Sequence, residues 1–290
     1  MPALEITTVI GCPLMCTVCP QNNLISNYKS PNKYLTFENF ETVLNKIPKF
    51  VRIDFSGMSE PWINKNCTKM FELTLKNNYD VAIYTTLVGM DHNDTDKVIR
   101  LIENHKSQIK VLCVHLPDKH GNMRGWKETD EYHYALKNIL KFKDESFFQA
   151  MTMNYDEEVN ESIKSYQIKL VGYNKNWLAH TRAGSLLINE RNKNITLLKK
   201  ENLSPVSCRS TPFYDHNVLL PNGDVALCCM DYSLKHIIGN LLNETYENLY
   251  LSNEMIKIMK ENKKQEYSKC SICKSCDNVI NHKVFNNTWL

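Results

Sequence analysis

The stretch LEITTVIGCPLMCTVC, residues 4–19, places three cysteines directly after a short apolar run. Residues 4–10 are rich in β-branched side chains, a composition that predicts a strand. Cys12, Cys16 and Cys19 then follow at Cys-x3-Cys-x2-Cys spacing. Because α/β barrels carry their chemistry at the carboxyl ends of their strands, we expect these thiols at the functional rim of a parallel sheet.

An alternation of strand and helix patterns continues from this run as far as residue 171. Short β-branched runs predict strands, and apolar residues at every third or fourth position predict helices between them. About six β/α units indicate a parallel sheet with helices outside, that is, a partial (β/α)6 TIM-like barrel. The further predicted strands are 51–55, 81–84, 109–115, 147–153 and 168–171, and the predicted helices are 36–47, 70–73, 98–102, 132–140 and 157–163.

Composition excludes several classes of protein. With 290 residues, 42% hydrophobic and only 9 Gly, the chain is neither collagen-like nor disordered. Its 35 basic and 32 acidic side chains are scattered, so we expect neither nucleic acid nor a membrane as partner. The first apolar stretch is short and has no basic flank, and no run of about 18 apolar residues exists, so neither a secretory leader nor a membrane span is expected.

Eleven cysteines are many for one chain, and most of them fall in two tight groups. An odd number in tight groups favours metal ligation over a disulfide framework, and hence a reducing, cytoplasmic location. The first group offers three thiolates and no fourth. An iron–sulfur cubane held by three cysteines keeps one iron open to a small ligand. The alternative is a structural zinc site that a distant His or Cys completes.

The cysteine loop after the first strand resembles the radical S-adenosylmethionine (SAM) superfamily, whose fold is a partial (β/α)6 barrel. The segment FSGMSEP, residues 55–61, at the end of the second strand is similar to that family's Gly-Glu-Pro motif. A carboxylate beside the methionyl ammonium of SAM would form a charge-assisted hydrogen bond. The resemblance implies a [4Fe–4S] cluster on the three cysteines and SAM contacts from Gly57, Ser59, Glu60, Pro61 and Thr86.

The chain after residue 188 follows a different pattern. We read residues 1–188 as the barrel, 189–205 as an Asn/Lys-rich connector and 206–290 as a smaller cysteine-rich domain. Asn222-Gly223 stands between two apolar runs and predicts a β-hairpin, because both residues tolerate positive φ. A helix is predicted over 244–260.

The second cysteine group resembles the SPASM/twitch auxiliary-cluster domains that follow radical SAM barrels. Its six cysteines fit the shorter twitch form, which implies one auxiliary [4Fe–4S] cluster. The resemblance implies Cys208, Cys228, Cys273 and Cys276 as the ligands, with Cys270 as the main competitor. Cys229 is less suited, because adjacent residues of a strand point to opposite sides. We assign no role to the lone residues Cys67 and Cys113.

The resemblance implies a 5′-deoxyadenosyl radical that abstracts hydrogen from a substrate carbon. A fully ligated auxiliary cluster would accept an electron, which favours oxidation of an alcohol carbon. Residues 52–55, 115–120 and 180–184 are similar to those of cyclitol-oxidising members. His115 is a candidate for substrate or SAM contact. Arg182 is a candidate for hydrogen bonding to substrate oxygen, because guanidinium keeps its proton.

Other functions stay open at this point. The substrate would be a sugar- or cyclitol-like small molecule, or else a peptide, and an external donor such as flavodoxin or ferredoxin would supply electrons. An epimerase is a further alternative, with Cys67 or Cys113 returning a hydrogen atom. A non-catalytic zinc or electron-transfer protein is the remote one.

Overall fold

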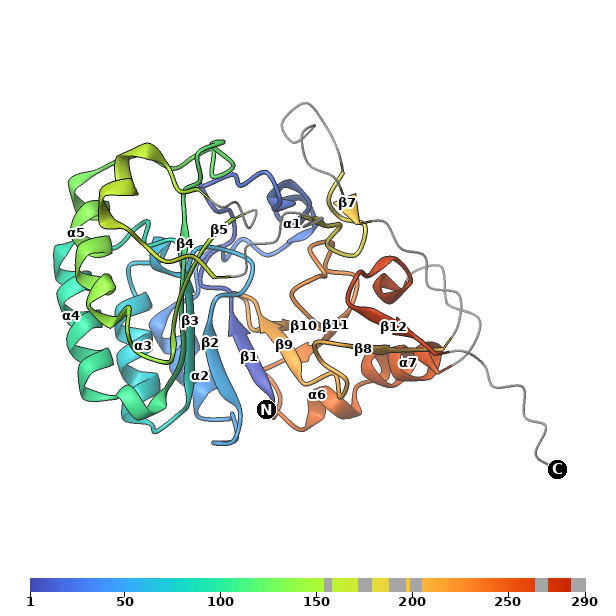
Figure 1. Cartoon of the computed structure of the whole chain (residues 1–290). Helices are drawn as coiled ribbons and strands as arrows, with labels where there is room; N and C mark the ends of the chain where they lie inside the picture. The colour runs from blue at the N-terminus through green and yellow to red at the C-terminus, as the bar shows by residue number, and fades with distance from the viewer. Residues whose placement is uncertain (154–157, 172–178, 188–196, 199–204, 264–270, 283–290) are drawn as a thin grey trace.

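The computed structural model describes residues 1–153, 158–171, 179–187, 197–198, 205–263 and 271–282 (Figure 1). One eight-stranded sheet runs through it in the order β11-β10-β9-β1-β2-β3-β4-β5. Strands β1 to β5 are parallel to one another, and β9 pairs parallel with β1 on the side away from β2. The strands are β1 (Ala3–Ile6), β2 (Arg52–Phe55), β3 (Val81–Thr85), β4 (Ile109–Leu116), β5 (Phe148–Thr152), β9 (His216–Leu219), β10 (Asp224–Ala226) and β11 (Ile237–Asn240).

Helices cover the outer face of the parallel strands, as the α/β prediction expected (Figure 1). Side chains of Thr36, Asp91 and Thr129 cap α2, α4 and α5, and each accepts a backbone N–H of the first turn. The helices are α1 (Gln21–Asn27), α2 (Phe37–Leu44), α3 (Cys67–Lys76), α4 (His92–Asn104) and α5 (Asp130–Ile139). Short 3-10 turns are η1 (Pro61–Ile63), η2 (Lys106–Gln108), η3 (Leu140–Phe142), η4 (Glu161–Tyr166) and η5 (Ile272–Ser275).

The strands separate an apolar outer face from a polar inner face. Ile53 and Phe55 of β2 are buried in the main core. Arg52 and Asp54 alternate with them and line a cavity on the opposite side of the sheet. Since successive strand residues point to opposite faces, the helices cover the apolar set and the barrel interior receives the charged set.

The predicted sixth strand, 168–171, is absent, although these residues are described. Gln167 ends the preceding 3-10 turn with a left-handed φ of 50°. Afterwards only Val171 donates a backbone hydrogen bond to β5, to the Ala150 carbonyl at 2.8 Å. One bond makes no strand ladder, so the (β/α)6 prediction is wrong by one strand within the described residues. The helix predicted over 157–163 is likewise the 3-10 turn η4.

The C-terminal region contains the predicted hairpin. Strands β9 and β10 pair antiparallel across a turn in which Gly223 has a φ of 86°. The single helix predicted over 244–260 is instead two, α6 (Asn248–Leu251) and α7 (Asn253–Asn262), and the Ser252 side chain caps α7. Strand β8 (Val206–Cys208) pairs antiparallel with β12 (Val279–Asn281), and β6 (Ala179–His180) pairs with β7 (Leu197–Leu198). Most of the predicted connector lies outside the described residues.

None of the helices in the described ranges combines the length and apolar character needed to cross a lipid bilayer.

Candidate functional site

The first cysteine group lines a cavity of about 410 Å³ at the carboxyl ends of the parallel strands. Cys12, Cys16 and Cys19 all contribute to its wall. Burial raises the pKa of the Cys12 thiol to about 11 and that of Cys16 well above its usual range. A bound metal reverses this effect, because a coordinating thiol is deprotonated outright. The three thiols interact electrostatically with one another and pack in one small cluster. Among the described residues, no three His, Cys, Asp or Glu side chains converge as the ligands of a single metal ion would.

The loop that follows β4 supports the cysteine loop from the side. The Thr17 amide donates to the Asn122 carbonyl at 2.9 Å, and the Gly125 amide donates to the Leu14 carbonyl at 2.7 Å. A Cβ atom at Gly125 would overlap the Pro13 carbonyl oxygen. Glycine is therefore required where this loop meets the backbone between Cys12 and Cys16.

The predicted SAM-binding segment reaches the same cavity from the end of β2. Gly57, Ser59, Glu60 and Thr86 line the cavity, whereas Pro61 does not and instead begins η1. The Ser59 hydroxyl is buried and has no partner among the described residues. A buried hydroxyl without a partner is costly, so a ligand with a polar group at this point fits the site.

The Glu60 carboxylate holds the ends of β2 and β3 together. It accepts hydrogen bonds from the Thr85 hydroxyl at 2.7 Å, the Thr86 amide at 2.6 Å, the Thr86 hydroxyl at 2.7 Å and the Trp62 amide at 3.3 Å. Burial raises its pKa to about 7, against the lowering effect of these bonds. Four donors occupy the acceptor positions of a carboxylate, so Glu60 shapes the segment besides facing the cavity.

Charged and aromatic side chains of the barrel interior form the rest of the cavity wall. Burial, with a smaller contribution from Arg182, lowers the pKa of His115 to about 4, so its ring is neutral at pH 7. His115 stacks on Tyr84 with ring centroids 6.5 Å apart. The Arg52 guanidinium binds the Asp54 carboxylate through two bonds, at 2.6 and 2.7 Å. The structure thus brings both predicted catalytic residues, His115 and Arg182, to the cavity of the first cysteine group.

Glu5 of β1 also lies in this interior and is not among the site residues predicted from the sequence. Its carboxylate has no cation within salt-bridge distance among the described residues, and it accepts a hydrogen bond from the Ser56 hydroxyl at 3.4 Å. Burial and the nearby Asp54 carboxylate raise its pKa to about 7. A carboxylate with this pKa can gain or lose a proton at physiological pH.

The second cysteine group lines a smaller cavity of about 160 Å³. All four predicted ligands reach it: Cys208, Cys228, Cys273 and Cys276. Burial raises the pKa of the Cys276 thiol to about 12. The Asn262 side-chain amide donates to the Cys273 sulfur at 3.4 Å, a contact that suits a thiolate acceptor. Cys270, the predicted competitor, lies outside the described residues.

The two cavities share a wall. Glu5, His216 and Cys229 line both of them. Cys229 interacts with the Glu5 carboxylate, whereas its neighbour Cys228 interacts electrostatically with Cys273 and Cys276. Cys228 and Cys229 lie after the end of β10, and both line the second cavity, so the strand alternation used to set Cys229 aside does not apply to this pair.

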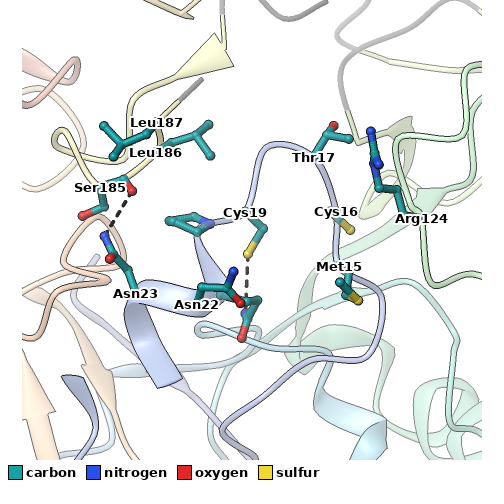
Figure 2. Close-up of a pocket in the computed structure, with 12 residues that line it drawn as sticks. Met15, Cys16, Thr17, Cys19, Asn22, Asn23, Arg124, Ser185, Leu186 and Leu187 are labelled. Carbon is teal, nitrogen blue, oxygen red and sulfur yellow. Dashed lines mark hydrogen bonds between the residues drawn. The ribbon is translucent and has the colours of Figure 1, made fainter. Parts of the chain in front are cut away.

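A third cavity, of about 270 Å³, opens on the outer side of the cysteine loop (Figure 2). Cys16 and Cys19 lie between Arg124 on one side and Leu186 and Leu187 on the other (Figure 2). The first cysteine group is therefore reached from two sides, from the barrel interior and from this outer opening.

Sequence signals existed for some of the residues that were missed. In the run Arg52-Ile53-Asp54-Phe55, charged and apolar residues alternate, which indicates a strand with a charged inner face. Glu5 sits likewise between Leu4 and Ile6. His216 carries no such local signal, because pairing between β9 and β1 brings it to the site. Tyr232, which also lines the large cavity, comes from the segment after β10 and carries none either.

Comparisons with known proteins agree with this geometry. Residues 208–277 match the SPASM family, described as an iron–sulfur cluster-binding domain. The solved structure of BtrN in complex with AdoMet and 2-DOIA has a TM-score of 0.62 at 16% identity, over 96% of this chain and 93% of that chain. That of anSMEcpe with bound AdoMet and Cp18Cys peptide has a TM-score of 0.55 at 16% identity, over 95% and 86%.

The structure of Streptococcus suis SuiB bound to S-adenosylmethionine has a TM-score of 0.52 at 12% identity, over 95% of this chain and 70% of that chain. No protein of curated function is detectably similar to the chain in sequence. The chain thus has the fold of these S-adenosylmethionine-bound proteins, and its C-terminal part matches an iron–sulfur domain.

Proposed function

We propose that the protein is a radical SAM enzyme that oxidises an alcohol carbon of a sugar- or cyclitol-like small molecule. When bound, SAM and two [4Fe–4S] clusters supply a 5′-deoxyadenosyl radical for hydrogen abstraction and an acceptor for the remaining electron. Cys12, Cys16 and Cys19 would hold the first cluster. A twitch-type auxiliary cluster would lie on the four cysteines of the second cavity.

The shared wall between the two cysteine-lined cavities is the observation that carries oxidation. Hydrogen-atom removal from an alcohol carbon leaves one electron and one proton to be taken up. Glu5 stands on that wall with a pKa of about 7 and is the best-placed proton acceptor. His115, whose pKa is about 4, is the weaker base and would instead hydrogen-bond to substrate oxygen.

The remaining residues would bind and orient. The unpartnered Ser59 hydroxyl, Gly57 and Thr86 would contact SAM at the end of β2 and β3. Arg182 stays charged, because neighbouring Tyr232 and thiol groups outweigh its burial and raise its pKa. It would donate hydrogen bonds to substrate hydroxyl or carboxylate oxygen.

Two alternatives share the same cofactors. The anSMEcpe structure contains a peptide, so peptide modification is one of them. Epimerisation is the other, with Cys113 as hydrogen donor, because its thiol lies 3.9 Å from the His115 ring. Cys67 is fully buried in the outer core and suits that role less well. Net oxidation yields a ketone, whereas epimerisation in D2O yields deuterated product without oxidation.

The test is metal analysis and SAM cleavage by the anaerobically reconstituted protein, with hydroxyl-rich small molecules and peptides as probes. We expect about eight irons per chain, from two four-iron clusters, and 5′-deoxyadenosine in the presence of a flavodoxin- or ferredoxin-type reductant. Zinc in place of iron, with no deoxyadenosine, would support a non-catalytic protein instead. The proposed compartment is the cytoplasm, because a reducing environment preserves eleven thiols.

Replacing Gly125 by Ala is expected to weaken the first cluster selectively. The new methyl group would push the Pro13 backbone and thereby displace the loop that carries Cys12 and Cys16. Iron should fall from about eight to about four per chain, and SAM cleavage should fall with it. Gly121→Ala in the same loop is the control: its φ of 68° adds backbone strain to the loop, but a Cβ there meets nothing within 4 Å, so this variant lacks the overlap with the cysteine loop. Full iron in the Gly125 variant would contradict the role given to this contact.

A further inference from the structure

The turn that carries Arg182 into the large cavity has an unusual backbone. Arg182, Ala183 and Gly184 follow β6 with φ values of 50°, 51° and 81°. Two of these left-handed residues are not glycine, and such conformations persist only where the surroundings hold them. The contacts of this turn therefore determine where the guanidinium of Arg182 lies.

Asp277 holds the start of this turn. Its Oδ2 accepts hydrogen bonds from the Thr181 amide at 2.6 Å and from the Thr181 hydroxyl at 2.9 Å. The Thr181 hydroxyl oxygen in turn accepts the Gly184 amide at 3.1 Å, so one threonine ties both ends of the left-handed segment. The Asp277 side chain is fully buried, and the residue directly follows Cys276, which lines the second cavity.

The same turn also contacts the first cysteine group. The Asn23 side-chain amide, in α1 just after Cys19, donates to the Ser185 carbonyl at 3.1 Å (Figure 2). The Arg182 guanidinium lies 5.9 Å from the centre of the Tyr232 ring. The Tyr232 hydroxyl lies 3.6 Å from the Cys19 sulfur. Residues 181–185 therefore bridge the two cysteine-lined cavities.

We propose that Asp277 is a positioning residue for Arg182. Through Asp277, the place of Arg182 at the substrate cavity depends on a cluster being bound at the auxiliary site. This inference rests on the proposed function, because a cluster on Cys273 and Cys276 would fix the segment that ends in Asp277. With that segment fixed, the two bonds to Thr181 hold Arg182 and Ala183 in their left-handed conformation. Without it, the turn loses its support and Arg182 leaves its place beside the Tyr232 ring.

The test is limited trypsin digestion of the full-length protein, because trypsin cuts after arginine only where the chain can open locally. Mass spectrometry would follow cleavage of the Arg182–Ala183 bond. We expect slow cleavage in the reconstituted wild type and fast cleavage in the metal-free protein. Asp277→Ala, although reconstituted to full iron, should be cut at least about tenfold faster than wild type, since bonds to a charged acceptor are among the stronger ones.

Asp277→Asn is the conservative rescue, because its amide oxygen can accept the same two hydrogen bonds, and it should restore protection. Asp215→Ala is the matched control: this carboxylate accepts the Thr211 hydroxyl at 3.1 Å near Cys208, away from the Arg182 turn. Protection of Asp277→Ala equal to wild type, with about eight irons bound, would overturn this inference alone. About four irons in the wild type would overturn the auxiliary site and this inference together.

A second pair of variants covers the case in which Asp277→Ala does not fold. Thr181→Val removes the hydroxyl that joins Asp277 to Gly184 and keeps the backbone donor. It should speed cleavage after Arg182, and Thr181→Ser should restore the wild-type rate. Equal rates for the Val variant and the wild type would overturn the positioning role of Asp277.

Discussion

Cys16→Ala is expected to abolish SAM cleavage while the auxiliary centre survives. The Cys16 thiol lines the large cavity and the outer opening, and its removal leaves the first cluster two protein ligands. Iron should fall from about eight to about four per chain, because the loss of one ligand releases one four-iron cluster and not the other. No 5′-deoxyadenosine should form above the level of the metal-free protein.

Cys67→Ala is the matched control for this variant. Cys67 is equally a buried thiol, but it is the first residue of α3, packs in the outer core and lines neither cysteine cavity. It should keep both clusters and full SAM cleavage, with only a small loss of stability. The reciprocal variant, Cys208→Ala, should keep SAM cleavage and lose net oxidation. Eight irons retained in Cys16→Ala would refute the ligand set of the first cluster.

Local sequence patterns predicted the parts of the site that one segment builds. The spacing of Cys12, Cys16 and Cys19 and the apolar run before them placed these thiols at the rim, where the structure has them. The hairpin turn at Gly223 was predicted for the same reason, since a two-residue turn is decided by its own residues.

Pairing between segments far apart in the sequence builds the parts of the site that local sequence patterns did not predict. Strand β9 pairs with β1 although more than 200 residues separate Ala3 from His216. This pairing continues the sheet of the barrel into the cysteine-rich region, and it brings Cys229 beside Glu5. The missing sixth strand has a related cause: residues 168–171 have strand-like composition, but only one backbone bond connects them to β5.

The hydrogen bonds of Glu60 could not be predicted from the sequence either. Its motif indicated a carboxylate that faces an ammonium, and the sequence carries no sign that Thr85 and Thr86 supply three of its hydrogen bonds. Two adjacent threonines at the end of a strand are common. Only the spatial neighbourhood of β2 and β3 turns them into donors for this carboxylate.

Glu5→Gln is expected to lower substrate oxidation by about 10²- to 10⁴-fold, the usual contribution of a general base. The amide keeps the size of the side chain but cannot accept the hydroxyl proton. SAM cleavage should persist, uncoupled from product, because Glu5 is not among the residues expected to hold the cluster or SAM. An unchanged KM with a reduced kcat would separate proton transfer from binding. Glu5→Asp, which keeps the carboxylate one methylene further back, should retain part of the activity.

The pH dependence gives this prediction a second measurement. Burial and Asp54 raise the pKa of Glu5 to about 7, so the base is protonated below that pH and the oxidation rate should rise as pH passes through it. In the Glu5→Gln variant, the oxidation rate should not show this rise with pH. In the cofactor-free protein the effect on stability has the opposite sign. Because the folded pKa of Glu5 lies above its ordinary 4.5, the contribution of this residue to stability is full at low pH and is lost as pH rises towards 7. In thermal unfolding, the melting temperature of Glu5→Gln should fall less steeply with rising pH than that of the wild type. Identical profiles for the two proteins would show that Glu5 is not the group that titrates, and would contradict its role as proton acceptor.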